Sequence, residues 1–442
     1  MQGLYSTEIL FHYIVCFVIL LKTYSDIRKR KFICILDTCN IGIAFYLFLI
    51  PGLYYMLCDE SEFDLLKFYD EYGMYKSFFF SIICYVCLNI GYKSMKYRCR
   101  SKIDEPAVNV VRYSFLLLVL SACGLYFWSQ NFGGLASLLL NAGSIRSGFI
   151  EASNGTAFFK HFVPLSKLLV IFLFNYLFVF HKQRHDSMSR KLFLYILFVV
   201  SLIISFVFIL ADDSRSSFGL FLFMFVVSKM LYSISIKHTA FFTTFTKTAL
   251  LVLFIVFLIL NGDMILGYFR GTDIETEGNK HTFAESFCHN FRCIINSPYY
   301  ACYYLEKMNG NLMIWDDIQT GLTSWFPTSL KPFPDAVRTW DLNTVIHKIR
   351  TPLWGQFPHS IIANSLYDLS YFGIVIIPFL FGAIAKRVDV YFMSRIKNVF
   401  YFSVYCLLLM SFANFIQGFC LYYIIFGLFY IVLGLLIYKY VL

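Results

Sequence analysis

Residues 192–211 read LFLYILFVVSLIISFVFILA, an unbroken apolar run without a charged side chain. A helix of about 20 such residues crosses the hydrocarbon core of a bilayer. It is also one of the few forms that satisfies its own backbone hydrogen bonds in lipid. Arg190 and Lys191 stand immediately before the run. The stretch therefore predicts a membrane-spanning helix that begins at a basic loop.

Similar runs recur along most of the chain, and the composition agrees with them. The 442 residues are 59% hydrophobic and 20% aromatic, and only 14% are charged, against about 25% in soluble domains. This excludes a soluble enzyme, a disordered scaffold and a secreted disulfide module. The first run, 3–21, lacks the basic start and small-residue cleavage site of a signal peptide. We expect an all-α polytopic membrane protein whose first span is 3–21.

The apolar runs predict about eleven membrane-spanning helices. They lie near 3–21, 33–57, 77–92, 108–128, 161–180, 192–211, 217–236, 249–268, 361–384, 398–416 and 419–438. With these spans, 22 of the 37 Lys and Arg residues fall on one side of the membrane. The positive-inside rule makes that side cytoplasmic. The N-terminus is then outside and the C-terminus inside.

The outer side carries one unusually long segment. We divide the chain into helices 1–8 at 1–261, a large outer loop at 262–360 and helices 9–11 at 361–442. The loop holds four of the five Trp and six of the ten Pro. Apolar residues from Phe283 to Ile295 recur at helical spacing and predict an amphipathic helix. Loops of this length are usually functional.

Sequence motifs exclude several kinds of chemistry. The chain has no P-loop, GxGxxG, HExxH or GxSxG context, so nucleotide, zinc-protease and serine-hydrolase sites are not expected. Asp212-Asp213, Asp273-x-Glu275 and Asp316-Asp317 are acidic pairs that could bind a divalent cation, but such pairs are common in solvated turns. We therefore expect no metal and no cofactor. The net charge of +10 reads as a topology signal, so we expect no nucleic-acid partner.

Arginines on the predicted outer side are candidate ligands for phosphate. They are Arg146, Arg215, Arg270, Arg292, Arg338 and Arg350. Guanidinium binds phosphate oxygens in a bidentate manner, and cations at the outer ends of helices run against the positive-inside trend. One explanation is the pyrophosphate of a lipid carrier. The other is pairing with neighbouring carboxylates, for instance Arg215 with Asp212 or Asp213.

Two further groups of residues are candidates for binding sugars and moving protons. Trp340 belongs to a set of loop tryptophans that could stack on sugar faces or form an interfacial belt. His359 stands where the long loop returns to the membrane, and histidine is the usual base near neutral pH. It could equally order the start of the next helix. Asp368 is a rival base, about two turns into that helix, where a carboxylate would be costly in lipid.

The segment from Gly355 to Gly373, GQFPHSIIANSLYDLSYFG, resembles the end of the large periplasmic loop in bacterial O-antigen polymerases of the Wzy type. In that family a Pro-x-Ser element leads into a helix and an aromatic-Gly pair follows. The Asp-Ser-Arg-Ser-Ser turn at 213–217 resembles the family's arginine turn. The helix number and the late outer loop are also similar over essentially the whole chain.

The resemblance implies a GT-C-like glycosyltransferase in the bacterial inner membrane. It would polymerise undecaprenyl-pyrophosphate-linked oligosaccharides at the periplasmic face, beside a chain-length regulator and a flippase of the same pathway. His359 and Asp368 would then be the catalytic candidates. Arg146, Arg215, Arg270, Arg338, Arg350, Trp340 and Tyr367 would contact pyrophosphate or sugar. The alternatives are a ligase-type glycosyltransferase, whose family shares the arginine and histidine theme, and a flippase or transporter for lipid-linked oligosaccharide.

Overall fold

In the part of the chain that it describes, the computed structural model contains helices and no strand. The described residues are 2–57, 73–96, 109–146, 150, 155–180, 187–211, 215–239, 243–244, 246, 283–308, 310–323, 332–333, 336–350, 359–418 and 420–440. Several of the helices contain π-helical or 3-10 segments, labelled η. These insertions change the helix direction locally and therefore the face that a helix presents.

The first half of the chain contributes α1 (Gln2–Arg30), α2 (Ile35–Ile43), η1 (Ala44–Leu49), α3 (Ile50–Leu57), α5 (Gly73–Ser94), α6 (Val110–Gln130), α7 (Leu135–Leu140), α8 (Ala142–Arg146), η2 (Gly155–Phe162), α9 (Leu165–Phe174), η3 (Asn175–Val179) and α10 (Met188–Ala211). The second half contributes α11 (Arg215–Leu231), η5 (Tyr232–Ile236), α14 (Phe283–Lys307), α15 (Ile314–Leu322), α16 (Thr339–Arg350), α17 (Ile361–Met393), α18 (Val399–Phe415) and α19 (Leu421–Tyr440).

Eight of the described helical segments are long and apolar enough to cross a membrane. They are Thr7–Arg30, Ile35–Leu57, Tyr75–Ser94, Val110–Gln130, Phe158–Val179, Met188–Ala211, Phe218–Ile236 and Ile361–Met393. Two shorter apolar helices, Val399–Phe415 and Gly427–Tyr440, overlap the last two predicted spans. The predicted span at 249–268 lies outside the described residues. The chain is therefore an all-α multi-pass membrane protein, and the count of eleven stays a prediction.

Helix α10, which contains the apolar run 192–211, exposes apolar side chains and buries small polar ones, as a lipid-facing helix does. In α10, Ile196 is 52% exposed and Ile203 is 58% exposed. Ser201 and Ser205 on the same helix are fully buried, and the Ser205 hydroxyl donates to Ser166 Oγ of α9 at 2.9 Å. Without a hydrophobic drive between helices in lipid, small polar residues of this kind hold helices together.

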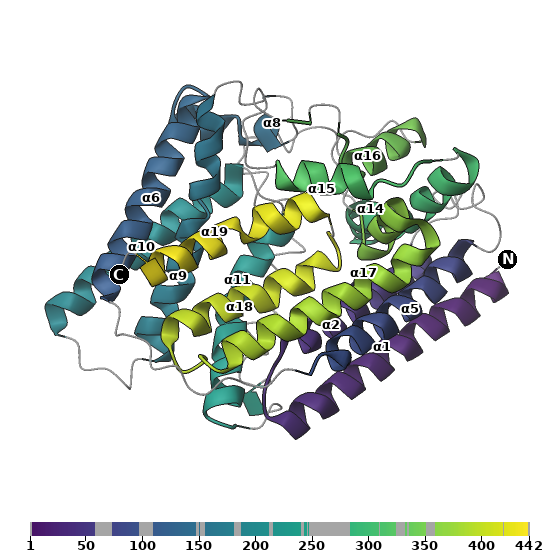
Figure 1. The fold of residues 1–442 in the computed structure, drawn as a ribbon, viewed down its shortest axis with the longest axis horizontal. Helices are drawn as coiled ribbons and strands as arrows, with labels where there is room; N and C mark the ends of the chain where they lie inside the picture. The colour runs from purple at the N-terminus through teal and green to yellow at the C-terminus, as the bar shows by residue number, and fades with distance from the viewer. Residues whose placement is uncertain are drawn as a thin grey trace.

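The helices form a bundle with a group of shorter helices at one end (Figure 1). The long helices α1, α5 and α17 run side by side, and α18 and α19 lie on the other side of α17, toward α9 (Figure 1). Helices α14, α15 and α16 gather near the start of α17. The predicted amphipathic helix in the long loop is confirmed as α14, while the placement of this loop outside the membrane stays a prediction.

The basic ends of several helices meet at the other end of the bundle. Lys386 near the end of α17 lies 4.8 Å above the ring of Tyr92 at the end of α5. The last residue of α1, Arg30, forms an ion pair with Asp37. This arrangement agrees with the alternation of charge in the predicted loops. It separates the basic side of the bundle from the side that holds α14–α16.

Helices α5 and α17 are packed backbone against backbone. A Cβ placed on Gly91 would lie 2.0 Å from the carbonyl oxygen of Phe379, and a Cβ on Gly382 would lie 2.1 Å from that of Leu88. Small residues permit this approach, which is a common means of joining helices in membranes. The contact holds the membrane-crossing part of α17 firmly on α5.

Helix α17 is broken near its start. Leu369 has φ −132° and ψ 19°, and Ser370 has φ 55° and ψ −151°, so neither is helical. Every residue from Ile361 to Asp368 is buried, whereas Phe372 just past the break is 78% exposed. The predicted span at 361–384 is thus two helical pieces in one, and the first piece belongs to the packed group at the end of the bundle.

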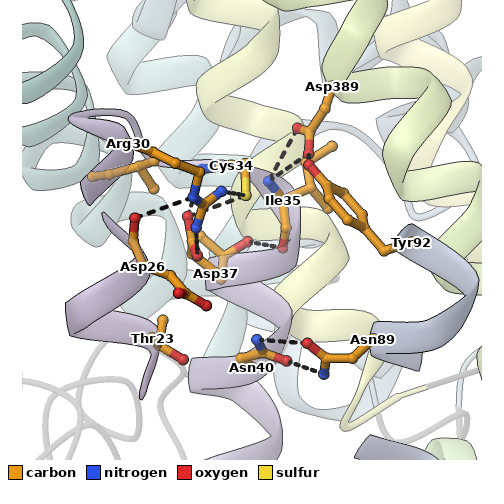
Figure 2. A network of polar contacts seen from close by, with 12 residues as sticks. Thr23, Asp26, Arg30, Cys34, Ile35, Asp37, Asn40, Asn89, Tyr92 and Asp389 are labelled. Atoms are coloured by element: carbon orange, nitrogen blue, oxygen red, sulfur yellow. Dashed lines mark hydrogen bonds and ion pairs between the residues drawn. The ribbon is translucent and has the colours of Figure 1, made fainter. Parts of the chain in front are cut away.

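A buried polar cluster fixes the basic end of the bundle (Figure 2). Both carboxylate oxygens of Asp389 in α17 accept the backbone N–H of Ile35, at 3.0 and 3.2 Å, at the start of α2. The hydroxyls of Tyr92 and Tyr405 also donate to Asp389, at 2.5 and 2.6 Å. A carboxylate at a helix N-terminus satisfies an otherwise unpaired amide. Asp389 therefore ties α17 to α2, α5 and α18, and we call this set the Asp389 cluster.

Candidate active site

A second buried polar network lies at the opposite end of α17, and it contains both residues proposed as the base. His359 Nε2 lies 3.0 Å from the hydroxyl of Thr339, the first residue of α16. The same hydroxyl lies 3.1 Å from Asp317 Oδ1 in α15. His359, Thr339 and Asp317 are each at most 2% exposed. A histidine, a hydroxyl and a carboxylate from three separate segments thus contact one another in series.

A second branch of the network leads from Thr339 to Asp368. The Thr339 hydroxyl lies 2.9 Å from Asn364 Oδ1, and Asn364 Nδ2 donates to Asp368 Oδ2 at 2.6 Å. Asn364 and Asp368 are one helical turn apart in the first piece of α17 and therefore share a face. Asp368 is only 5% exposed and is enclosed by protein, which removes the cost of placing it in lipid.

The start of α19 holds Asp317 in place. Its Oδ2 accepts the backbone N–H of Leu421 at 3.2 Å, and its Oδ1 accepts from Cys420 Sγ at 3.2 Å. The positive end of the α19 dipole favours a carboxylate at this point. Asp317 therefore connects α15 to α19 while it contacts the hydroxyl that faces His359.

Local structure at the start of α17 orients His359. Ser360 is the N-cap of α17, and its side chain accepts the N–H of Ala363 at 3.4 Å. The N–H of Ser360 donates to Ser297 Oγ of α14 at 3.1 Å, and the N–H of Ile361 donates to the carbonyl of Ile416 at 3.1 Å. Because these bonds use helix-terminal amides that would otherwise be unpaired, they fix the backbone next to the imidazole.

Two polar atoms of the network have no hydrogen-bond partner among the described residues. They are His359 Nδ1 and Asp368 Oδ1, both shielded from solvent. Buried polar atoms are nearly always paired, so an exception calls for a functional explanation such as a bound ligand. One atom is on each branch of the network.

Burial lowers the pKa of His359 below its ordinary value, since the charged imidazolium is poorly solvated there. The nearby carboxylates of Asp317 and Asp341 and the backbone around His359 and Ser360 oppose that effect. The imidazole is thus neutral near pH 7 and able to accept a proton, and groups that stabilise the resulting imidazolium are already in place.

Trp340 and Tyr367, both predicted to contact substrate, lie beside His359. Their ring centroids are 5.7 Å and 6.1 Å from that of the imidazole. Trp340 is half-buried, while Tyr367 is fully buried and its hydroxyl donates to Asn343 Oδ1 at 3.0 Å. The network therefore includes an aromatic wall, and its role toward a substrate stays a prediction.

The predicted arginines are only partly described. Arg338 forms a bidentate pair with Asp341, with Nε–Oδ2 at 2.5 Å and Nη2–Oδ1 at 2.9 Å, directly before α16. Arg146 ends α8, Arg215 begins α11 and Arg350 ends α16, but their side chains lie outside what the structure describes. Arg270, with Asp212 and Asp213, also falls outside it.

Thr339 and Asn364 were not predicted as site residues, and Asp317 was predicted only as half of an acidic pair. In the structure Asp317 is buried while Asp316 is partly exposed. Among the described residues no group of three or more His, Cys, Asp or Glu is arranged to hold a metal ion. The carboxylate signal at 316–317 was visible in the sequence, but its partner 22 residues away was not.

Comparison of the chain with models of protein families, with curated proteins and with solved structures finds no match. The fold itself defines an all-α multi-pass membrane protein, with a buried histidine–carboxylate network at one end of its bundle.

Proposed function

We propose that this protein is a GT-C-like glycosyltransferase that polymerises undecaprenyl-pyrophosphate-linked oligosaccharide repeat units into O-antigen or a related surface polysaccharide. The observation that carries the proposal is the pair of buried, unpartnered atoms, His359 Nδ1 and Asp368 Oδ1, beside an aromatic wall. A neutral imidazole nitrogen with no protein partner is suited to accept a proton from a sugar hydroxyl.

In the proposed reaction the acceptor is the non-reducing sugar of a repeat unit on one lipid carrier. Its hydroxyl oxygen attacks the anomeric carbon of the chain held on a second carrier. The new glycosidic C–O bond forms as the C–O bond to pyrophosphate breaks, and undecaprenyl pyrophosphate leaves with the electron pair. The hydroxyl proton passes to His359 Nδ1. Asp368 Oδ1 accepts a hydrogen bond that orients the acceptor.

Pyrophosphate is a good leaving group when positive charge faces it, so this reaction requires no ATP. In the proposal Arg146, Arg215, Arg270 and Arg350 provide this charge. Arg338 is already paired with Asp341, and it contributes only if phosphate competes with that carboxylate. Trp340 and Tyr367 supply the faces on which sugars stack.

The proposed setting is the periplasmic face of a bacterial inner membrane, with the N-terminus outside and the C-terminus in the cytoplasm. The separation of the basic helix ends from the His359 network supports this orientation. The proposed partners are lipid-linked oligosaccharides, together with a chain-length regulator and a flippase of the same pathway.

The test uses purified full-length protein in liposomes, supplied with lipid-linked repeat units extracted from cells that lack the gene. Wild-type protein should produce a ladder of polymerised carriers. His359→Asn should lower the rate by about 10²–10⁴-fold, the usual contribution of a general base. His238→Asn is the matched control, because His238 is exposed and lies after η5 on the basic side.

Three outcomes separate the proposal from its alternatives. A ladder that depends on His359 supports polymerisation. Transfer of a chain only when a lipid A core acceptor is added would instead indicate a ligase. Movement of the lipid-linked unit across the liposome membrane without a new glycosidic bond would indicate a flippase. Equal ladders from His359→Asn and wild-type protein would refute the assigned base.

A further inference from the structure

The protons of the network can be counted around the Thr339 hydroxyl. Asn364 donates from Nδ2 to Asp368, so its Oδ1 faces Thr339 as an acceptor. The Asp317 carboxylate also accepts from Thr339. A threonine hydroxyl carries one proton. A third acceptor, Cys420 Sγ, lies farther away, at 3.8 Å. We assign the proton to one of the two nearer and stronger oxygen acceptors, which leaves none for His359.

The contact between His359 and Thr339 is therefore a hydrogen bond from the histidine. With the protons assigned in this way, Nε2 donates to Thr339 Oγ1 across the 3.0 Å contact. A neutral imidazole carries one proton on its two nitrogens, so the lone pair is on Nδ1. This is the same nitrogen that has no hydrogen-bond partner among the described residues. The proton assignment and the missing partner of Nδ1 thus indicate the same atom.

We infer that Asp317 acts on His359 through the Thr339 hydroxyl, holding the imidazole with its proton on Nε2 and its lone pair on Nδ1. Asp317 and Thr339 are then positioning residues for the proposed glycosyl transfer, and this inference rests on that proposed function. The fully buried hydroxyl serves as a link that lets a carboxylate on α15 determine which nitrogen of a histidine before α17 is basic.

The link also has an electrostatic consequence. When Nδ1 accepts a proton, the imidazolium is one hydroxyl away from the Asp317 carboxylate, which stabilises the new charge. The titratable groups of the described residues around His359 and Thr339 are Asp317 from α15, Asp341 from α16, Tyr367 and Asp368 from α17, and Cys420 before α19. Of these, Asp317 is the carboxylate that accepts directly from the hydroxyl that His359 contacts, at 3.1 Å, whereas the Cys420 sulfur lies farther from that hydroxyl, at 3.8 Å.

The kinetic test compares Thr339→Val, Thr339→Ser and Asp317→Asn. Valine keeps the shape but removes the hydroxyl, so turnover should fall on the order of 10- to 100-fold, as when the partner that orients a histidine is removed elsewhere. KM should change little, and serine should restore turnover to within a few-fold. Asp316→Asn is the control, since Asp316 is the adjacent, partly exposed carboxylate.

The pH profile separates this role from a merely structural one. Asp317 favours the charged form of His359, so Asp317→Asn should move the acidic limb of the turnover profile to lower pH. Asparagine can still accept the N–H of Leu421 and preserve the start of α19. Wild-type turnover in Thr339→Val, no rescue by serine, or an unmoved acidic limb in Asp317→Asn would each overturn the inference.

A spectroscopic readout is independent of the reaction. Solid-state NMR of the ¹⁵N-histidine-labelled protein in lipid, with the His359 signal assigned by its loss in His359→Asn, should show the proton on Nε2. Thr339→Val should mix the two tautomers. A proton on Nδ1 in the wild type would overturn the inference. The expected tautomer in a protein that forms no polymer would refute the proposed function and leave the Asp317–Thr339–His359 link intact.

Discussion

Replacement of Asp389 by alanine should destabilise the basic end of the bundle. In the Asp389 cluster one carboxylate receives the backbone N–H of Ile35 and the hydroxyls of Tyr92 and Tyr405. All three donors are in buried residues. Alanine removes the shared acceptor, and water cannot readily replace it there. The three donors then remain buried without a partner.

The size of the effect follows from the number of donors. A hydrogen bond to a charged group contributes about 1.5–3 kcal/mol, so three of them set an upper bound of about 9 kcal/mol. Relaxation of the surroundings reduces this, and we expect ~3–5 kcal/mol, the range for breaking a buried charged contact. Tyr92→Phe removes one donor and keeps the carboxylate, so its expected loss is about 1.5–3 kcal/mol.

Two buried thiols report on this region. Cys34 and Cys39 are 0% exposed and lie at the start of α2 and within it. A pulse of N-ethylmaleimide at increasing temperature, read by peptide mass spectrometry, should label both at a markedly lower temperature in Asp389→Ala. Cys420, at the opposite end of the bundle, shows whether unfolding is local or global. Asp26→Ala is the control, because only the backbone carbonyl of Asp26 bonds Arg30. Labelling temperatures equal to wild type would refute the assigned role of Asp389.

Four further predictions concern other parts of the molecule. Ser370 has φ 55° and ψ −151°, a region that costs a non-glycine residue about 1–3 kcal/mol, so Ser370→Gly should raise the unfolding temperature; a lower one would contradict the break in α17. Gly91→Val should abolish a monodisperse peak in size-exclusion chromatography, because its Cβ would lie 2.0 Å from a backbone carbonyl. In intact cells, a cysteine in place of Trp315, which is 71% exposed, should react with a membrane-impermeant thiol reagent. A cysteine in place of His238 should not react. The reverse result would refute the proposed orientation of the chain in the membrane. Because burial lowers the pKa of His359, turnover should persist below pH 6.5, the ordinary histidine value, and fall only as the pH drops through the lowered pKa; an acidic limb at or above that value would contradict a buried base.

The local pattern of apolar residues in the sequence was enough to predict most of the helices. Apolar runs predicted the spans that became α1, α5, α6, α10 and α18, and helical spacing predicted α14. The break at Leu369 and Ser370 was not predictable, because the sequence there contains neither proline nor glycine at the broken positions and the break depends on packing. Gly373 beyond it fits against the carbonyl of Ser365, 1.9 Å from where a Cβ would lie.

The candidate site was predicted only where a residue stood out locally. His359 and Asp368 were found because they are polar residues at the edge of an apolar run. Thr339 and Asn364 were missed because each is unremarkable in sequence, and their importance comes from hydrogen bonds over 20 and more residues. Asp389 was missed for the same reason, since its amide partner is 354 residues away.

The break in α17 also determines how a substrate would reach the network. The second piece of α17 starts at Ser370 and runs to the basic end of the bundle, where Lys386 and Asp389 make their contacts. In the proposed orientation the first piece, Ile361–Asp368, faces the outer headgroups. A substrate anchored in lipid would arrive there by lateral diffusion in two dimensions. Its effective concentration is then its mole fraction among the lipids, so adding inert phospholipid at constant total substrate should slow turnover by surface dilution.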